Sequence, residues 1–178
     1  IFFVETELKD LPAQNYKIVE NEVLEEFKIG KNFEINNNKP YITYTHLLDL
    51  LSVIEKKEIF NFFDYGAGNL NLFFYLRKNF KNLNYFFFDQ TEILEILKNY
   101  NETQNFEKLN ICSNFKKEKL DFVYFGSSLQ YLKKYKSEIS QFKNSTNYLL
   151  ISQTPFFINK DIKNEFLVMK QINMHPKI

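Results

Sequence analysis

The sequence predicts an α/β fold in which a doubly wound, mostly parallel sheet follows an N-terminal helical flank. Two observations predict this fold. From residue 59 onward, short apolar runs of strand length alternate with segments whose apolar residues recur at helical spacing. The runs are apolar at nearly every position, as strands are when helices cover both faces of a parallel sheet.

The composition is that of an ordinary folded protein of one domain. The chain has 178 residues, of which 44% are apolar and 25% charged, and its formal net charge is +1. This balance argues against a dedicated nucleic-acid binder, which carries a strong basic excess. The single cysteine, Cys112, excludes an internal disulfide framework and a zinc site built from several thiolates, and we expect no metal. The 21 phenylalanines and 11 tyrosines predict an aromatic core rather than a base-stacking surface.

No segment of the sequence has the length and apolar character of a membrane-spanning helix, which needs roughly 20 residues. The longest apolar runs, such as residues 85–88, have the length of a strand. We therefore expect no membrane span and a cytoplasmic protein. The sequence begins with Ile1 rather than Met, which indicates a fragment or a processed form, and an upstream targeting segment stays open.

Residues 1–57 predict a helical flank or cap, and residues 58–178 predict the sheet domain, the two forming a single domain overall. Two amphipathic helices are expected in the flank. The first ends at Gly30, and the second starts after Thr45, a candidate N-cap. The apolar residues at helical spacing are Tyr16, Val19, Val23 and Phe27 in the first helix and Leu47, Leu50, Leu51 and Ile54 in the second.

The sheet domain alternates strands and helices in the order that a doubly wound fold requires. The helix after the second strand has Thr91 or Asp89 as its candidate cap. Asp121 opens the fourth strand at its amino end, away from the expected cleft, so we interpret it as structural. The expected strands are 59–63, 85–88, 109–112, 122–125 and 148–151, and the expected helices run from 70 to 80, from 93 to 100 and from 129 to 142.

A glycine turn follows the first strand, at the carboxyl edge where sheets of this kind bind ligands. Gly66 and Gly68, two of the four glycines in the chain, stand one residue apart in this turn. Glycine allows a tight turn and a close approach of the backbone to a ligand. The second strand ends in Asp89 and Gln90, where an acid can accept hydrogen bonds from both hydroxyls of a ribose. A plain strand-to-helix turn and a helix-capping carboxylate are the alternatives, but the combination favours a nucleoside-type ligand.

The residues around the turn narrow the choice of nucleoside ligand. A dinucleotide fingerprint needs a third glycine where this chain has Asn71, and no Gly-Lys-Ser or Gly-Lys-Thr phosphate loop occurs. Asp64, two residues before the first glycine, would repel a pyrophosphate but can pair with an ammonium group, directly or through water. S-adenosylmethionine carries an ammonium group, a ribose for Asp89 and no phosphate.

Four segments carry a family resemblance. FFDYGAGNLN is similar to the first motif of the class I S-adenosylmethionine-dependent methyltransferases, and YFFFDQ is similar to the second. ICSNF stands where that family places residues beside the adenine, and LDFVYFGSSLQYL resembles its fourth strand and the loop beyond. The resemblance implies a Rossmann-like methyltransferase fold and S-adenosylmethionine as the cofactor. It assigns cofactor binding to Asp64, Gly66, Ala67, Gly68, Asn69, Asp89, Gln90, Ser113, Asn114, Ser127, Ser128 and Leu129.

A narrower resemblance, over residues 41–172, is carried by SSLQYL, ISQTPF and the Gln of MKQI. These segments are similar to those of methyltransferases encoded among surface-polysaccharide genes, which implies a sugar as the acceptor. The chain departs from the families at Leu70, which replaces the third glycine and would narrow the room over the methionine part of the cofactor. It departs again at Gln153, which replaces an arginine.

The sequence ends at Ile178, where the family fold continues with a further helix and an antiparallel strand pair. Residues 166–172 supply at most one of these strands, so the C-terminal part of the sheet is expected to be incomplete. Either the sequence is part of a longer chain, or a partner such as a second copy covers the sheet edge.

The sequence specifies the catalytic residues poorly. Methyl transfer is an in-line displacement at a carbon activated by positive sulfur, so positioning can supply much of the acceleration. An oxygen nucleophile still needs a base, and no carboxylate or histidine stands in an obvious place for one. The candidates for orienting an acceptor are Gln130, Tyr131 and Thr154.

The sequence therefore predicts an enzyme that transfers a methyl group from S-adenosylmethionine to a small molecule or a surface-glycan sugar. The alternative is a non-catalytic methyltransferase-like module that acts in assembly or binding, and Leu70, Gln153 and the short C-terminal part favour it. Asn71 and Asp64 argue against a nicotinamide-dependent oxidoreductase. Nucleic-acid methylation is disfavoured by the net charge and by the lack of an Asn-Pro-Pro-Tyr or Asp-Pro-Pro-Tyr sequence.

Overall fold

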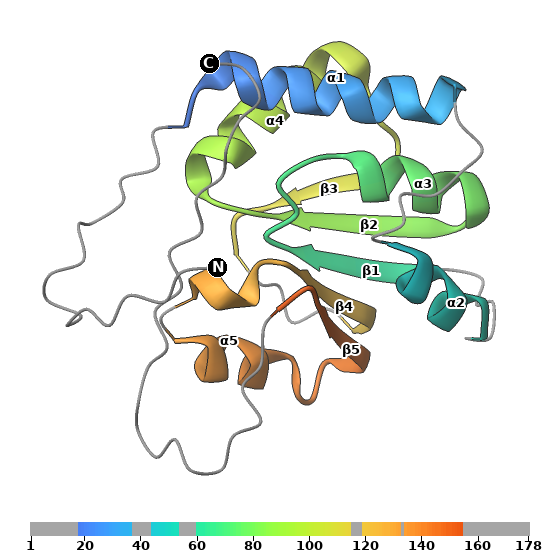
Figure 1. The fold of residues 1–178 in the computed structure, drawn as a ribbon, viewed down its shortest axis with the longest axis vertical. Helices are drawn as coiled ribbons and strands as arrows, with labels where there is room; N and C mark the ends of the chain where they lie inside the picture. The colour runs from blue at the N-terminus through green and yellow to red at the C-terminus, as the bar shows by residue number, and fades with distance from the viewer. Residues whose placement is uncertain (1–17, 37–43, 54–59, 115–118, 133, 155–178) are drawn as a thin grey trace, which may run out of the picture. The chain divides into compact units, whose positions relative to one another are not determined.

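A five-stranded sheet forms the centre of the structure, a computed structural model that describes residues 18–36, 44–53, 60–114, 119–132 and 134–154 (Figure 1). The strands lie in the order β3-β2-β1-β4-β5, and each neighbouring pair is parallel. The predicted α/β class and the doubly wound, Rossmann-like sheet are confirmed. The strands are β1 (Phe60–Tyr65), β2 (Leu83–Phe88), β3 (Leu109–Cys112), β4 (Leu120–Gly126) and β5 (Thr146–Ser152).

Helices cover both faces of this sheet (Figure 1). On one face α1 packs against α3 and α4, and on the other face lies α5. None of the helices in the described ranges combines the length and the apolar character that crossing a membrane requires. The helices are α1 (Glu20–Asn36), α2 (Thr45–Val53), α3 (Asn71–Asn79), α4 (Thr91–Gln104), the 3-10 turn η3 (Leu129–Tyr131) and α5 (Tyr135–Phe142).

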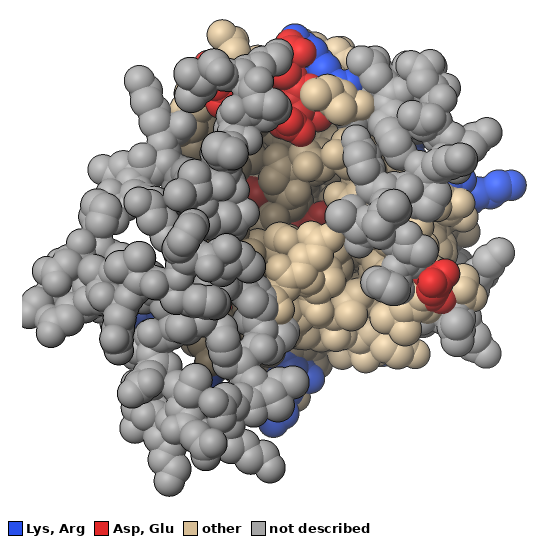
Figure 2. Space-filling view, in the orientation of Figure 1, with Lys and Arg blue, Asp and Glu red and all other residues tan. Residues whose placement is uncertain are grey.

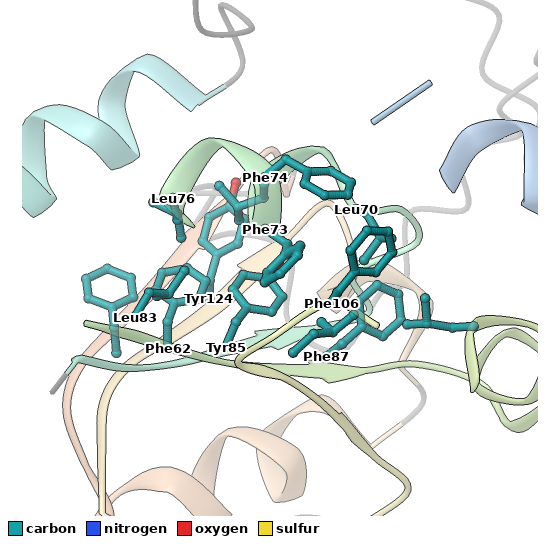
Figure 3. Close-up of a cluster of buried hydrophobic side chains, with 14 of the residues drawn as sticks. Phe62, Leu70, Phe73, Phe74, Leu76, Leu83, Tyr85, Phe87, Phe106 and Tyr124 are labelled. Atoms are coloured by element: carbon teal, nitrogen blue, oxygen red, sulfur yellow. The ribbon is translucent and has the colours of Figure 1, made fainter. Parts of the chain in front are cut away.

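Aromatic side chains fill the core on both faces of the sheet because successive strand residues point to opposite faces. In β1, Phe62 belongs to the cluster under α1, α3 and α4, whereas Phe63 belongs to the cluster on the side of α5. Figure 3 shows Phe62, Phe73 and Tyr85 in the first of these clusters, where the ring centroids of Phe73 and Tyr85 lie 5.4 Å apart. The rings of Phe62 and Phe122 stack with their centroids 5.4 Å apart. Most aromatic side chains in the described part of the chain are therefore core, as predicted, whereas Tyr131, Tyr135 and Tyr148 are exposed.

Two predicted helix ends in the N-terminal flank are wrong, and Val19, predicted in the first helix, precedes it and is 40% exposed. α1 does not end at Gly30 but continues to Asn36, because its packing along α3 and α4 outweighs the roughly 1 kcal/mol that a glycine costs inside a helix. α2 begins at Thr45, so Thr45 is the first helical residue and not the cap ahead of it. Tyr16, Ile54, the domain boundary at residue 57 and the strand expected at 166–172 lie outside the described residues.

The helix predicted over residues 129–142 is two separate elements. η3 ends at Tyr131, Leu132 is extended, and α5 begins at Tyr135. Leu129 is buried in the core cluster on the α5 side, directly after β4, and this anchor holds a short turn at the strand end. A single helix would move Leu129 out of that place, which the helical periodicity alone does not reveal.

A row of amide side chains crosses the sheet near its amino edge. Asn110 donates to Asn84 over 2.5 Å, and Asn84 donates to Asn61 over 2.9 Å. Beyond β1, the carboxylate of Asp121 accepts hydrogen bonds from the Asn61 backbone N–H at 3.0 Å and from the Asn147 amide at 3.1 Å. The polar groups here are matched to one another across all five strands, which supports the structural interpretation of Asp121.

The two neighbouring leucines of α2 test the packing of this helix. Leu51 is 1% exposed and belongs to the core, whereas Leu50 is 39% exposed although its spacing predicts burial. We expect Leu51→Ala to lower the free energy of unfolding by about 2–5 kcal/mol and Leu50→Ala by less than about 1 kcal/mol. Urea unfolding followed by circular dichroism measures both. Equal losses would mean that α2 packs in another register.

Candidate functional site

The candidate site lies at the carboxyl edge of the sheet, where the strand order reverses. The chain moves from β1 outward to β2 and β3 and then crosses to β4 on the other side of β1. From this edge the chain leaves β1 toward α3 on one face of the sheet and leaves β4 toward α5 on the other face, and doubly wound sheets bind ligands at such a point. The residues predicted for cofactor and acceptor binding follow β1, β2, β3, β4 and β5 and are gathered at this one edge.

The glycine turn after β1 is held against two other loops. Gly66 and Gly68 have φ angles of +70° and +66°, in the left-handed region that favours glycine. The N–H of Gly66 donates to the carbonyl of Phe88 over 2.8 Å, and the N–H of Ala67 donates to the same carbonyl over 3.3 Å. A Cβ on Gly66 would lie 2.6 Å from the Cβ of Ser128, whereas a Cβ on Gly68 would meet open space. The turn is thus packed on one side and open on the other.

Asp89 joins the end of β2 to the glycine turn. One carboxylate oxygen accepts the Gly68 N–H at 2.7 Å, and the other accepts the Gln90 N–H at 2.7 Å. Each oxygen retains a further lone pair that can accept a ligand hydroxyl. Burial raises the pKa of Asp89, while the hydrogen bonds from Gln90 and Gly68 lower it. The predicted capping of α4 by Thr91 or Asp89 is wrong, because the N-cap residue is Gln90 and no side chain caps the helix.

Asp64 is a buried carboxyl beneath the same turn. Its side chain is 3% exposed and accepts a hydrogen bond from the hydroxyl of Tyr85. Burial raises the pKa of Asp64 to about 7, the Tyr85 hydrogen bond lowers it, and the charge of nearby Asp89 raises it. A cationic ligand would offset the cost of ionising this carboxyl, and a phosphate would increase it. Tyr85 was not predicted, because only the strand register brings a β2 hydroxyl to Asp64.

The remaining predicted residues near β1, β2 and β3 differ in their exposure. Asn69 accepts the N–H of Asn71 at 3.0 Å and closes the first turn of α3. Gln90, Ser113 and Asn114 are exposed at the ends of β2 and β3. Leu70 does not narrow the room over the turn, contrary to expectation, because its side chain is fully buried in the cluster of Figure 3.

The loops after β4 and β5 are joined through strained backbone. Ser127 and Gln153 have φ angles of +56° and +54°, which cost about 1–2 kcal/mol in a residue other than glycine. The Ser127 hydroxyl donates to Gln153 Oε1 over 2.7 Å, and the Ser127 N–H donates to the Ser152 carbonyl over 3.0 Å. In the sequence, Gln153 stands out only as a departure from a family arginine. The signal that could have marked it is its place directly after the fifth strand.

Ser128 and Leu129 follow Ser127 into the protein. The Oγ of Ser128 is buried and has no hydrogen-bond partner in the described part of the chain. Leu129 is 3% exposed and packs in the core cluster on the α5 side, and its carbonyl accepts the N–H of Leu132 at 3.1 Å.

The three residues predicted to orient an acceptor also lie together. The Thr154 hydroxyl donates to Gln130 Oε1 over 3.2 Å. This is a second side-chain hydrogen bond, after that of Ser127 with Gln153, between the loops that follow β4 and β5. Tyr131, beside Gln130, is 62% exposed. Hydroxyl and amide groups of this kind can hold a polar, uncharged molecule.

The edge is therefore acidic on the side of β1 and β2 and uncharged at the residues named after β4 and β5. Figure 2 shows a hollow in the surface, with atoms of acidic residues visible inside it. Among the residues that the structure describes, no group of three or more His, Cys, Asp or Glu side chains could hold a metal ion. The arrangement suits a ligand that carries hydroxyls and a positive charge.

Comparisons with known proteins include a distant structural likeness. No protein-family model matches the chain, and no curated protein sequence matches it. Among solved structures, a crystal structure described as a SAM dependent methyltransferase from Aquifex aeolicus matches with a TM-score of 0.49 and 14% sequence identity. The match covers 76% of this chain and 72% of the other.

The two glycines of the turn are expected to respond differently to alanine. Both substitutions force a side chain into the left-handed region, but only Gly66→Ala also brings a Cβ against Ser128. Gly68→Ala should cost about 1–2 kcal/mol of unfolding free energy, and Gly66→Ala about 1–3 kcal/mol more. The double variant Gly66→Ala, Ser128→Gly should recover the additional loss. Urea unfolding measures all three, and no recovery would contradict the contact between the two loops.

Stability should depend on pH through Asp64. Its pKa is about 7 in the folded protein and 3.8 in the unfolded chain, so the folded protein binds more protons between these values. The contribution of Asp64 to the unfolding free energy therefore falls as pH rises through this window, by at most about 1.4 kcal/mol per pH unit. Asp64→Asn should gain stability relative to the wild type between pH 5 and pH 8. Urea unfolding across this range, with exposed Asp49→Asn as the control, measures the difference; parallel curves would contradict it.

Proposed function

We propose that the chain is an S-adenosylmethionine-dependent methyltransferase. The observation that carries the proposal is the hydrogen bond from the Gly68 N–H to Asp89, with buried Asp64 under the same turn. This bond brings a glycine turn and the acid after the second strand together at the switch point of the sheet. The open space beside Gly68 leaves room for a ligand to approach the backbone there.

The chemistry of the residues fits this cofactor. Asp89 would accept the ribose hydroxyls, and Asp64 would pair with the ammonium group, directly or through water. The backbone at Gly66, Ala67 and Gly68 would lie against the cofactor. The family resemblance adds Asn69, Gln90, Ser113 and Asn114 toward the nucleoside and Ser127, Ser128 and Leu129 toward the methionine part. When bound, S-adenosylmethionine supplies a methyl carbon that is activated by positive sulfur.

Asp64 and Asn71 favour this cofactor over a dinucleotide. Asp64 would repel the pyrophosphate of a nicotinamide cofactor, and Asn71 replaces the glycine of the dinucleotide fingerprint, whereas Asp89 could serve the ribose of either cofactor. Asn71 is also buried, with its Oδ1 unpartnered in the described chain, so the first turn of α3 lacks the glycine surface on which a pyrophosphate packs.

The acceptor that we propose is a small molecule, and more narrowly a surface-glycan sugar. Support comes from the resemblance of SSLQYL and ISQTPF and from the uncharged group of Gln130, Tyr131 and Thr154. These residues would orient the acceptor, since positioning supplies much of the rate of an in-line displacement. We further propose that the enzyme acts in the cytoplasm and that a second copy covers the sheet edge.

One observation favours the alternative of a non-catalytic module. Both oxygens of Asp89 already accept backbone N–H groups, so its carboxylate has a structural use without any ligand. A fold of this kind can retain the glycine turn for its own stability after turnover is lost.

Binding of S-adenosylhomocysteine, the product of the proposed cofactor, tests the assignment. We expect calorimetric titration to give saturable binding, and we expect Asp89→Asn to weaken it at least about tenfold, because hydrogen bonds to a charged carboxylate are lost. Glu92→Gln, an exposed acid in the first turn of α4, is the matched control and should bind as the wild type does. NAD should not bind.

Two outcomes would count against the proposal. If the folded wild type does not bind S-adenosylhomocysteine, the non-catalytic alternative would be favoured. Binding that Asp89→Asn and Glu92→Gln reduce equally would place the ligand elsewhere. Circular dichroism of each variant separates a loss of binding from a loss of folding.

A further inference from the structure

Two residues other than glycine share the left-handed backbone conformation at the carboxyl ends of β4 and β5. They are Ser127 and Gln153, with φ angles of +56° and +54°. A hydrogen bond of 2.7 Å joins the Ser127 hydroxyl to Gln153 Oε1, and the Ser127 N–H donates to the carbonyl of Ser152. The two hydrogen bonds therefore fix the two strained residues relative to each other.

Among the described residues, two more that are not glycine have a positive φ angle. Lys108, with φ +64°, lies directly before β3, at the amino edge of the sheet and away from this pair. Asn105, with φ +50°, closes α4 at its C-cap, where asparagine is common. Serine and glutamine have no such preference, and a strained conformation persists only where its surroundings determine it. Such positions gather at ligand clamps and active sites. The contact between Ser127 and Gln153 is thus a candidate for a role in binding.

The contact reaches the glycine turn through one residue. Ser128 follows Ser127, and its Cβ stands so close to Gly66 that an added Cβ there would lie 2.6 Å away. Packing this tight transmits a displacement of Ser127 to the turn. Gln153, in the loop after β5, therefore influences the position of the loop after β4. That loop in turn packs against the glycine turn after β1.

We propose that Gln153 is a positioning residue of the site. By holding the Ser127 hydroxyl, it fixes segment 127–129 against the glycine turn and thereby sets how tightly the homocysteine part of the ligand is bound. This inference rests on the proposed function. It assigns no contact between Gln153 and the nucleoside, whose ribose is the partner of Asp89 on the other half of the edge.

The test compares two ligands on one set of variants. Titration of S-adenosylhomocysteine reports on both halves of the site, whereas adenosine, titrated into the millimolar range, reports on the nucleoside half. We expect Gln153→Ala to bind S-adenosylhomocysteine about fivefold more weakly, as for one lost hydrogen bond, and to bind adenosine as the wild type does. Gln104→Ala at the end of α4, where the side chain donates to Thr103, is the matched control and should change neither affinity.

Variants at Ser127 distinguish the effect of the lost hydroxyl from the effect of backbone strain. Ser127→Gly and Ser127→Ala both remove the hydroxyl, but only glycine adopts φ +56° without strain, so Ser127→Gly should melt at a higher temperature than Ser127→Ala. Both should bind S-adenosylhomocysteine more weakly than the wild type. A merely structural pair would instead give Ser127→Gly the affinity of the wild type.

The outcomes separate the inference from the function on which it rests. Unchanged affinity of Gln153→Ala for S-adenosylhomocysteine, with normal wild-type binding, would overturn the inference and leave the proposed function in place. An equal loss for adenosine would also overturn it, because the effect would then not be confined to the homocysteine half. Failure of the wild type to bind either ligand would overturn the proposed function and the inference together.

Discussion

The hydrogen bond from the Gly68 N–H to Asp89 is the contact on which the geometry of the site depends. Parallel pairing sets Tyr65 beside Phe88, so β1 and β2 end at the same level. The turn after β1 can then bond to the end of β2, but only because Gly66 and Gly68 adopt positive φ angles. The strand register, the glycine turn and Asp89 therefore depend on one another, and a change in any of the three displaces the other two.

The two edges of the sheet differ in whether all of their buried polar atoms have hydrogen-bond partners. At the amino edge, the row from Asn110 to Asn147 pairs amides and a carboxylate across the strands. At the carboxyl edge, Ser128 Oγ and Asn71 Oδ1 are buried without a partner in the described chain. Buried polar atoms are seldom left unpaired unless water, a ligand or a functional constraint accounts for them. The imbalance supports placing function at the carboxyl edge.

Local pattern predicted the sheet well because its strands are apolar on both faces and its helices are amphipathic, and neither feature depends on distant residues. The residues predicted at the turn could also be recognised from the sequence, because they stand at or just after the ends of predicted strands. They are Asp64, Gly66, Gly68 and Asp89. Other features depend on contacts far apart in sequence. Packing carries α1 past Gly30, the anchor of Leu129 divides the last predicted helix, and register brings Tyr85 to Asp64. None of these three contacts produces a periodic pattern of apolar residues in the sequence.

The same left-handed backbone is built by different means on the two sides of the site. At Gly66 a side chain has no room, so glycine is required. At Ser127 and Gln153 the side chains remain although the conformation is costly, and they bond to each other. Because glycine at either place would relieve the strain and lose the bond, stability alone gives little reason to retain the pair. The side chains are better explained by what they position, which is the segment that meets Gly66.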